Sequence, residues 1–437
     1  MSENKKLTPK IRFKGFTEDW EQRKLPEIAN ISIGLVTTMT SHYMNHGVLL
    51  IRNSDIKDNK FEFDTDPIYL DEKFASENKH RQHQIGDVIT VHTGDVGTSA
   101  VITENEVNSI GFATLISRPN KEIIDSHYLS TFYNTDKHKK FAVLMSTGDG
   151  RTNYNLGDFI ELIVPFPKKG EQIKIARFIN NIDNLITLHQ RKYDKLVKIK
   201  SSLLEKMFPK NSSKIPEVRF KGFTEDWEQR KLSSIASMHA RIGWQNLRTS
   251  EFLDNGKYLL ITGTDFIDGR IDYSSCHYIE KKRYDQDRNI QVSNGSILIT
   301  KDGTLGKVAL IQGLSKPATL NAGVFNVLPL DKNNTDTYYL FQYLKAPFLL
   351  DYVDKKATGG TIKHLNQNIL VDFPIKKPNF EEQVKLGKLF CDIDNLITLH
   401  QRKLFFTNYL MLSMLSLFYQ YLYSPILELY VNMFFVL

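Results

Sequence analysis

The chain of 437 residues lacks the residue patterns that usually carry chemistry. Its only cysteines, Cys276 and Cys391, lie far apart and form no C-x-x-C pair, so neither a zinc site nor a disulfide framework is predicted. It contains no G-x-x-x-x-G-K-[ST], no H-E-x-x-H and no G-x-S-x-G, since Lys307 in GTLGKV precedes Val308. The N/D-P-P-F/Y stretch of amino-methyltransferases and a glycine-rich cofactor loop are also missing. We therefore expect no catalytic residues, no metal and no cofactor.

Other isolated residues give no stronger signal. A nuclease-like E-x-K occurs at Glu280 and Lys282, and its charged turn favours a chance match. Four histidines of one region have no metal-ligand spacing, and we expect most of them at the surface. They are His42, His80, His83 and His92. The N-terminal MSENKKLTPK has no apolar signal segment. With so few cysteines, a reducing, cytoplasmic setting is expected.

The overall composition is that of a globular protein with a basic balance. Hydrophobic residues make up 41% and charged residues 24% of the chain, which is enough for two cores of about 150 residues each. The formal net charge is +7 and the pI is near 9.0. This excess favours a polyanionic partner such as nucleic acid, although a solvated basic surface would look the same.

Two long segments of the sequence occur twice. RFKGFTEDWEQRKL fills residues 12–25 and again 219–232, and IDNLITLHQRK fills 182–192 and again 393–403. The stretches between them have diverged. A period near 210 residues is too long for a solenoid, so each copy is expected to be a domain plus a connector. A repeated frame around two different inserts indicates one scaffold that reads two targets.

The expected fold class is α/β (α+β), with two duplicated globular domains joined by two long helices in an antiparallel coiled coil. The predicted segments are a first domain at 12–167, a helical spacer at 168–210, a second domain at 219–376, a second spacer at 377–403 and an atypical hydrophobic tail at 404–437. Short apolar or alternating runs predict strands at 48–52, 87–92, 99–102, 159–164, 258–261, 296–299, 307–311 and 369–373. Helices are predicted near 125–145 and at 337–351.

The first spacer has the clearest periodicity. Two seven-residue ladders run through 171–208, one at Ile175, Ile182, His189, Leu196 and Leu203, the other at Ile179, Ile186, Tyr193, Lys200 and Met207. Such steps predict a coiled-coil helix of roughly 57 Å. The second spacer continues the pattern with Leu386, Ile393 and His400 beside Phe390 and Ile397. Residues 166–210 hold 11 Lys/Arg and 4 Asp/Glu, a net of +7, which fits either a spacer close to phosphate or a solvated helix face.

Polar loops that contain glycine recur in both copies and are the candidate contact surfaces. Glycine permits close backbone approach, and the neighbouring side chains supply donors for base edges and phosphates. Any one of these loops could equally be ordinary turn chemistry, so the argument depends on their recurrence with different side chains. The candidate DNA-binding residues are Arg52, Asn53, Thr93, Thr98, Arg151, Asn153 and Tyr154 in the first copy, and Thr262, Thr264, Lys301, Thr304, Thr361, Lys363 and His364 in the second.

With these features the chain resembles the specificity subunit of type I restriction–modification systems over residues 12–403. The resemblance rests on the duplicated RFKGFTEDWEQRKL, on PFPKKGEQIKIARFINNIDNLITLHQRK from residue 165, and on its partial copy FPIKKPNFEEQVKLGKLFCDIDNLITLHQRK from residue 373. It implies that each variable domain reads one half of a bipartite, gapped site in double-stranded DNA and that the helices set the gap. It also implies no catalysis by this subunit, with methyltransferase subunits and an ATP-dependent restriction subunit as partners.

The tail departs from this pattern. Residues 404–437 contain no Lys or Arg, one acid (Glu428) and ten aromatics. The favoured reading is a degenerate tail that impairs pairing with the first helix; burial against a partner subunit and a membrane span are the other two. Two alternative functions also stay open, a stand-alone DNA-modifying or DNA-cleaving enzyme and a membrane-tethered adaptor. The missing motifs disfavour the enzyme, and we do not expect a membrane partner.

Overall fold

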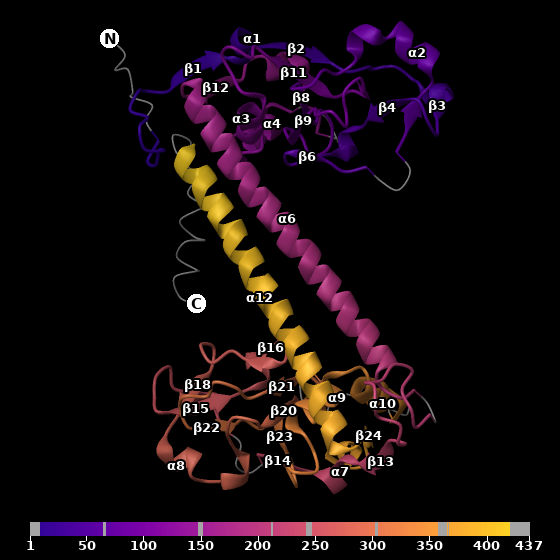
Figure 1. The fold of residues 1–437 in the computed structure, drawn as a ribbon. Coiled ribbons are helices and arrows are strands. Elements are labelled where there is room, and N and C mark those ends of the chain that lie inside the picture. The colour runs from indigo at the N-terminus through magenta and orange to yellow at the C-terminus, as the bar shows by residue number, and fades with distance from the viewer. Residues whose placement is uncertain are drawn as a thin grey trace. The chain divides into compact units, whose positions relative to one another are not determined.

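A computed structural model describes residues 9–63, 67–146, 152–210, 213–241, 247–301, 305–356, 365 and 367–419. The chain divides into two compact units. Among the described residues, unit 1 comprises those within 9–190 and 402–419, and unit 2 comprises those within 191–401. Two long helices, α6 (Lys169–Lys206) and α12 (Phe380–Phe418), each contribute one part to either unit (Figure 1). Each unit is therefore built from two separate stretches of chain.

Unit 1 holds two four-stranded sheets, a two-stranded ribbon and a short hairpin. The first sheet has the order β2-β11-β8-β9 and is antiparallel throughout; the second has the order β10-β4-β7-β3, with β10 parallel to β4. Strands β1 and β12 form the ribbon, and β5 and β6 form the hairpin. The strands are β1 (Glu21–Lys24), β2 (Ala29–Ile33), β3 (Tyr43–Met44), β4 (Val48–Ile51), β5 (Ile56–Lys57), β6 (Lys60–Phe61), β7 (Tyr69–Leu70), β8 (Val88–Thr90), β9 (Ser99–Val101), β10 (Ile110–Gly111), β11 (Leu115–Pro119) and β12 (Ile163–Phe166).

Helices cover the first sheet of unit 1, and side chains cap them where the sequence allows. Asp125 accepts a hydrogen bond from the backbone of Tyr128 at the start of α3, and Thr135 accepts one from His138 at the start of α4. The α-helices are α1 (Leu25–Ile28), α2 (Glu72–Glu77), α3 (Ser126–Tyr133), α4 (Asp136–Met145) and α5 (Leu156–Phe159); the 3-10 turns are η1 (Thr40–His42), η2 (Asn53–Asp55) and η3 (Lys79–Arg81). The helices predicted near 125–145 are confirmed.

Unit 2 repeats the first sheet and the ribbon with β14-β23-β20-β21 and β13-β24, beside the sheet β18-β15-β22-β19 and the hairpin β16-β17. Its strands are β13 (Glu228–Lys231), β14 (Ala236–Ala240), β15 (Tyr258–Ile261), β16 (Phe266–Ile267), β17 (Arg270–Ile271), β18 (His277–Ile279), β19 (Gln291–Val292), β20 (Ile297–Thr300), β21 (Val308–Leu310), β22 (Ala318–Leu320), β23 (Val324–Pro329) and β24 (Pro374–Lys377). Its helices are α7 (Leu232–Ile235), α8 (Lys281–Tyr284), α9 (Thr337–Lys345), α10 (Phe348–Lys356) and α11 (Gln367–Val371), with 3-10 turns η5 (Thr249–Glu251), η6 (Gly263–Asp265) and η7 (Arg288–Ile290).

Most strand predictions are confirmed, but two are wrong. Residues 159–164 and 369–373 were expected as strands, whereas α5 and α11 occupy the first parts of these apolar runs and the strands β12 and β24 begin later. Both strands contain a proline, Pro165 in β12 and Pro374 in β24. A two-stranded ribbon has only edge strands, so proline is tolerated there. The single helix predicted at 337–351 is two helices, since Pro347 separates α9 from α10.

The heptad ladders predict the spacer helices correctly. Ile175, Ile179 and Ile182 of α6 are buried in unit 1. In unit 2, Lys200 of α6 donates to Asp394 of α12, and Gln401 donates to the Tyr193 hydroxyl. From the second contact to the first, the position moves seven residues forward along α6, from Tyr193 to Lys200, and seven residues backward along α12, from Gln401 to Asp394. The two helices are therefore antiparallel, as in a coiled coil.

The repeated motifs pack against each other within each unit. In unit 1 the Arg12 guanidinium binds Glu171 through two hydrogen bonds of 2.6 and 3.0 Å, and in unit 2 Arg219 binds Glu382 through two of 2.8 Å. Glu171 and Glu382 side chains are both only 1% exposed. The hydrogen bonds with Glu171 raise the pKa of Arg12 above its usual value. The first repeated segment is thus clamped to the start of the spacer helix by a buried, bidentate ion pair.

The end of each spacer helix completes the core of the unit in which that end lies. Phe208 packs against Trp227 in unit 2 with ring centroids 5.9 Å apart, and Tyr419 packs against Trp20 in unit 1 at 6.0 Å. At the spacing of the second repeat, Tyr419 corresponds to Phe208. The expectation of a degenerate tail with impaired pairing is therefore wrong for residues 404–419, because they extend α12 and fill a position that the duplication provides.

The outward face of this part of α12 is nevertheless apolar. Phe405, Phe406 and Leu412 are 55%, 62% and 56% exposed, whereas the corresponding residues of α6 are Asp194, Lys195 and Ser201. None of the helices in the described part of the chain is both long and apolar enough to cross a membrane. Residues 420–437, the rest of the tail, lie outside the described residues.

Two histidines are buried in unit 1. His83 Nδ1 lies 2.9 Å from the Ser109 hydroxyl, and His138 Nδ1 lies 2.8 Å from the Tyr133 carbonyl oxygen. Burial lowers the pKa of each to about 4, so both are neutral at pH 7. His83, which is buried near Gly111, is an exception to the expectation that most of His42, His80, His83 and His92 lie at the surface.

Removing the carboxylate of a buried clamp should destabilise one unit selectively. We expect Glu171→Gln to lower the unfolding free energy of unit 1 by roughly 3–5 kcal/mol, because it strands the Arg12 guanidinium. Glu382→Gln should do the same to unit 2, and the exposed Glu21→Gln should change little. Amide hydrogen exchange, followed separately in peptides of the two units, measures this. Equal loss of protection in both units from either clamp variant would contradict the assignment.

Acid should weaken the core of unit 1 through His83 and His138. Each has a folded pKa below that of an unfolded histidine, so its stabilisation is complete above pH 6.5 and declines as the pH falls toward 4. The loss should reach on the order of 2–3 kcal/mol for each ring. Hydrogen exchange of β8 to β11 between pH 7 and 4.5 measures it. Unit 2, whose described residues include no buried histidine, serves as the comparison, and equal acid loss there would count against this origin.

Candidate nucleic-acid interface

In unit 1 the three predicted loops meet at the ends of the strands. The Asn53 side-chain oxygen accepts a hydrogen bond from the backbone of His92 at 2.8 Å and a longer one from Thr93. The Thr93 hydroxyl in turn donates to the Asn153 side-chain oxygen at 2.8 Å. Asn53, Thr93 and Asn153, which lie up to 100 residues apart, therefore form one continuous polar chain of half-exposed side chains.

Backbone hydrogen bonds hold these loops independently of the variable side chains. The Tyr154 amide donates to the His92 carbonyl at 2.8 Å, and the Gly94 amide donates to the Thr152 carbonyl at 3.3 Å. Gly94 and Gly97 have positive φ angles of 103° and 88°, a conformation that glycine adopts without strain. The hairpin between β8 and β9 can thus turn tightly and carry different residues at its tip.

Unit 2 builds the same frame with other side chains. Thr262 precedes η6 as Arg52 precedes η2, and both turns are closed by an aspartate. The Leu365 amide donates to the Lys301 carbonyl at 2.8 Å, as the Tyr154 amide does to His92. Lys301 therefore stands where unit 1 has His92. The two units thus share the backbone arrangement of these loops but differ in their side chains. This is the arrangement expected of two domains that recognise different sequences.

Several predicted residues have partners that limit what they can contact. Arg52 is held by a 2.7 Å ion pair to the buried Asp55 and is 26% exposed. The Thr262 hydroxyl donates to Asp265 at 3.0 Å and lies 2.7 Å from the Thr264 hydroxyl, and Thr264 is exposed. Arg52 and Thr262 therefore first serve to close their turns, while Thr264 projects from its turn.

Two of the candidates in unit 1 are buried, which corrects the expectation that they lie at the surface. Thr98 is 1% exposed and donates to Asp95 at 2.8 Å. Tyr154 is fully buried in the core, and burial raises the pKa of its hydroxyl. Thr98 and Tyr154 therefore support their loops from inside, because the chain turns inward immediately after each exposed loop tip. Five other candidates lie outside the described residues: Arg151, Thr304, Thr361, Lys363 and His364.

His92 is a member of the polar chain that sequence reasoning missed as a contact residue. Its Nδ1 lies 2.7 Å from the Thr93 hydroxyl, and partial burial lowers its pKa, which favours the neutral ring at pH 7. The sequence contained a signal that could have identified His92 as a contact residue, since it directly precedes the glycine-bearing TGDVGT loop. Because Nδ1 is engaged with Thr93, the neutral ring has Nε2 left for one further hydrogen bond.

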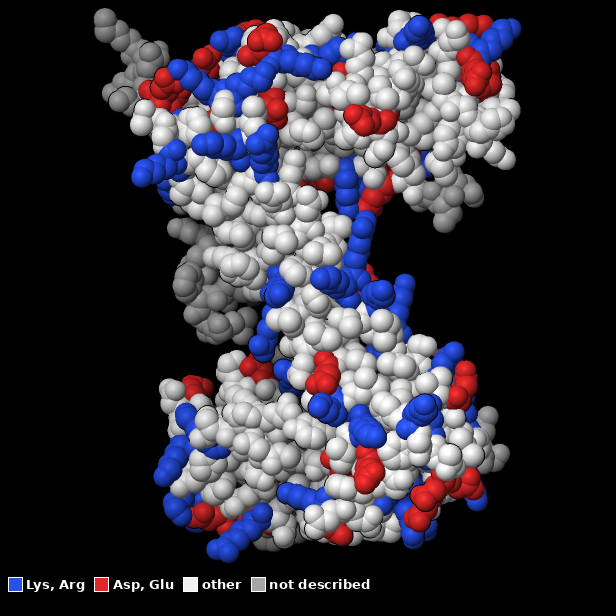
Figure 2. All heavy atoms as spheres, viewed as in Figure 1, with Lys and Arg blue, Asp and Glu red and all other residues white. Residues whose placement is uncertain are grey.

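Charge is distributed unevenly over the surface. Lysine and arginine side chains predominate along the exposed side of α6, whereas both signs are mixed over the globular parts (Figure 2). On α6 the basic residues Lys192, Lys195 and Lys198 belong to the segment that carries the net excess of the whole chain. Phosphates attract such a stripe whatever the base sequence.

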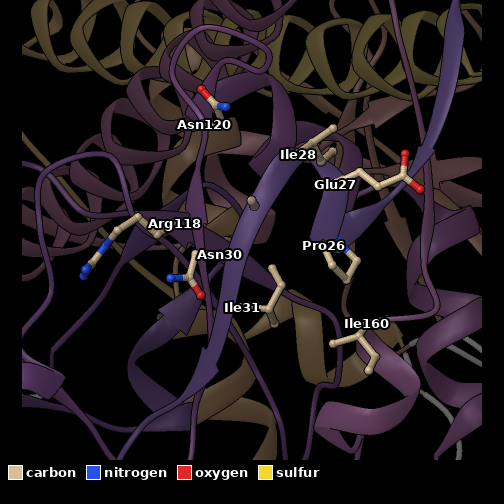
Figure 3. A pocket seen from close by; sticks show the side chains of 9 residues that line it. Pro26, Glu27, Ile28, Asn30, Ile31, Arg118, Asn120 and Ile160 are labelled. Carbon is tan, nitrogen blue, oxygen red and sulfur yellow. The ribbon is translucent and has the colours of Figure 1, made fainter.

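Two features of the described residues bear on catalysis. The described residues include no group of three or more His, Cys, Asp or Glu side chains that could hold a metal. Burial raises the pKa of the Cys276 thiol, so it is not an activated nucleophile. Figure 3 shows the side chains that line a surface hollow of unit 1. One of them, Arg118, forms an ion pair of 2.8 Å with Asp87. The lining of the hollow is formed by Pro26, Glu27, Ile28, Ala29, Asn30, Ile31, Arg118, Asn120 and Ile160.

Comparison with known proteins agrees with this arrangement. The family model "Type I restriction modification DNA specificity domain" matches twice, at residues 17–198 and 224–404. The "Type I restriction enzyme MjaVIII specificity subunit" of Methanocaldococcus jannaschii is 24% identical over 305 residues, 67% of this chain and 69% of that protein. The "Putative type I restriction enzyme MjaX specificity subunit" of the same organism is 24% identical over 400 residues, 88% and 89% of the two chains.

A solved structure shares the fold. The S subunit of a type I restriction–modification system from M. genitalium superposes with a TM-score of 0.59 at 14% sequence identity, covering 94% of this chain and 98% of that one. The two domain matches together span most of the chain, and each includes a copy of the repeated spacer segment. The chain therefore belongs to the family of type I restriction–modification specificity subunits, as its duplicated motifs predicted.

Proposed function

We propose that this chain is the DNA-recognition subunit of a type I restriction–modification complex, in which units 1 and 2 each read one half of a bipartite, gapped site in double-stranded DNA. The observation that carries the proposal is the repeated loop frame with different side chains. The Tyr154–His92 backbone bond in unit 1 recurs as Leu365–Lys301 in unit 2. Direct readout depends on the donors and acceptors that such loops present to base edges.

The reading residues of unit 1 are His92, Thr93 and Asn153, and those of unit 2 are Thr264 and Lys301. The Asn53 amide instead holds the loops together, since it donates to the Phe112 and Ala113 carbonyls and accepts from the His92 amide. The Asn153 amide presents a donor beside an acceptor, which suits the adenine edge in the major groove. The His92 ring, whose Nδ1 lies 2.7 Å from the Thr93 hydroxyl, keeps Nε2 for one further hydrogen bond. Lys301 lies over the Phe325 ring, with its ammonium 5.7 Å from the ring centroid, and a lysine suits the acceptors of guanine or a phosphate. The half-sites should therefore differ.

The subunit acts without catalysis of its own. Methylation and cleavage are the work of partner subunits, a methyltransferase and an ATP-dependent restriction subunit, that dock on it. The lack of signature motifs in the sequence supports this assignment. The test is incubation of the purified full-length chain with plasmid DNA and either S-adenosylmethionine or magnesium. Methyl transfer or strand cleavage by the chain alone would favour the enzyme alternative.

Binding selection on randomised duplex DNA tests the proposal itself. The full-length chain should enrich two short conserved blocks separated by an unspecified stretch of constant length. A single block would show that only one unit reads sequence, and no enrichment over random DNA would contradict sequence recognition by this chain. Affinity should fall steeply with salt in every case, because phosphate contacts release counterions.

Lys301→Met should weaken binding in a manner specific to one half-site. If Lys301 contacts a base, we expect a loss of about 1–3 kcal/mol for duplexes that carry the preferred half-site of unit 2, with recognition by unit 1 unchanged. The matched control is Lys316→Met, which removes an exposed lysine stacked on Tyr278 away from these loops. Titration of labelled duplexes with either half-site scrambled measures the effect. An affinity equal to that of the control variant would remove Lys301 from the interface.

The spacer helices should set the gap between half-sites. Since α6 and α12 pair antiparallel, one heptad must be inserted in both, between Leu188 and His189 and between Leu399 and His400, to keep the seam in phase. Seven residues add roughly 10 Å of helix, or about three base pairs at 3.4 Å each. The selected gap should lengthen by that amount with both half-sites retained. An unchanged gap would contradict the spacer role, and insertion in α6 alone controls for loss of register.

A further inference from the structure

In unit 2 a carboxylate between the spacer helices is neutralised by two lysines. Asp394 of α12 accepts hydrogen bonds from Lys200 of α6 at 2.7 Å and from Gln342 of α9 at 2.8 Å, and Lys345 lies 3.4 Å away. The Asp394 and Lys200 side chains are only 19% and 12% exposed. Although burial raises the pKa of Asp394, Lys345 and Lys200 lower it more, so the net shift is downward.

Unit 1 has the same carboxylate but not the same lysines. Asp183 occupies the position of Asp394 in the identical IDNLITLHQRK segment. At the same spacing, Lys200 corresponds to Met411 of the tail and Lys345 corresponds to Asn134. The register that sets Lys200 opposite Asp394 in unit 2 sets Met411 opposite Asp183 in unit 1. The tail has thus replaced the cation with a thioether.

The surroundings of Asp183 confirm that its bonded partner is neutral. The Asn59 amide donates to it at 3.1 Å, and the Asn59 oxygen accepts from Ser130 and from Asn134, both at 3.0 Å. Nothing in this set carries a positive charge. Buried carboxylates of this kind favour the protonated form unless a cation is near.

The nearest charged groups do not compensate. They lie on the β5–β6 hairpin and on α4: Lys139 of α4 pairs with Asp58 at 2.6 Å, and Lys60 pairs with Glu62 at 2.5 Å. Burial, assisted by the charge of Asp58, raises the pKa of Asp183 to about 6, while Asn59 and Lys60 act in the opposite direction. The residues of α3 and of its C-terminal end that hold Asn59 are the uncharged Ser130 and Asn134. On α12 the helix register places Met411 opposite Asp183.

We propose that acid strengthens the contact between α6 and the end of α12 in unit 1, whereas the equivalent contact in unit 2 is held by lysines at neutral pH. Because the folded form of unit 1 prefers protonated Asp183, the stabilisation is complete below pH 3.8 and is lost as the pH rises through about 6. In unit 2 the lowered pKa of Asp394 gives the opposite sign, since its ion pairs are lost only in strong acid.

The contact between α6 and α12 therefore differs in stability between unit 1 and unit 2 at neutral pH. At neutral pH the tail segment 402–418 is held in unit 1 by apolar contacts, through Met414, Leu415 and Phe418, against the cost of a buried charge at Asp183. We therefore expect this segment to open more often than residues 191–206, which play the same part in unit 2. Local opening of this kind is visible as hydrogen exchange.

Hydrogen exchange of the full-length chain between pH 8 and 5.5, corrected for intrinsic exchange rates, tests the proposal. Protection of 402–418 should rise about fourfold on acidification, because pH 5.5 lies only half a unit below the folded-state pKa of about 6 and the full two-unit shift is expressed only below pH 3.8. Asp183→Asn should be highly protected at every pH and remove the rise. Asp394→Asn, the matched change in unit 2, should instead lower the protection of 191–206 at pH 8.

A second variant restores the missing cation. Met411→Lys should raise protection of 402–418 at pH 8 and flatten its pH profile. The proposal is overturned if Asp183→Asn lowers protection at pH 8, or if it leaves the pH dependence of 402–418 unchanged. Should the lysine variant fail to fold, the Asp183→Asn comparison still decides. His83 and His138 act equally in the native chain and in Asp183→Asn, so their opposing acid effect cancels.

Discussion

Each core in this molecule depends on an aromatic residue delivered from the far end of a spacer helix. Phe208, at the end of α6, packs on Trp227, and Tyr419, just after α12, packs on Trp20. Burial of such rings removes large apolar areas from water and fixes their geometry through edge-to-face contacts. Since α6 starts in unit 1 and α12 starts in unit 2, neither unit completes its core from one continuous stretch. The end of each spacer helix therefore has a structural role in the core of the unit in which it lies.

The division between constant and variable parts follows from what holds each part. The ion pairs Arg12–Glu171 and Arg219–Glu382 join segments that are repeated in the sequence. The loops, by contrast, are fixed by backbone bonds such as the one from Tyr154 to His92, which do not depend on side-chain identity. Divergence of the loops therefore costs little stability, and a pair of sequence readers can change while the frame stays the same. Binding residues carried on loops of a rigid frame are common for this reason.

Much of the fold could be predicted from local pattern. The heptad ladders gave both spacer helices, and alternating runs gave most strands, because burial of one face imposes a period on the sequence. The true positions of β12 and β24 could not be predicted in this way, since each strand pairs with a segment more than 100 residues away. The candidate loops were found, yet the burial of Thr98 and Tyr154 depends on tertiary packing that no local pattern contains.

The tail is the clearest case in which local sequence pattern did not reveal the tertiary packing. Its composition suggested degeneration because the residues that face outward are apolar, which hid the fact that Phe418 and Tyr419 match Met207 and Phe208. An apolar residue in this segment can either fill the core or lie exposed on the outward face of α12. Only the packing of Tyr419 against Trp20 shows that it belongs to the core. The tail does not restore the charge pattern of the first spacer. Met411 fills space but leaves Asp183 without the lysine that pairs with Asp394 in unit 2.

The most direct test of the account is methylome mapping in a host that expresses this chain with a matching methyltransferase subunit. A parallel strain should carry a version whose tail after Lys403 is replaced by residues 193–210. The account predicts a bipartite, gapped adenine-methylation motif from the native chain, the same in both strains, because the native tail already closes unit 1. A motif that appears only with the replaced tail would contradict it, since the native tail would then not complete the frame on which both readers depend.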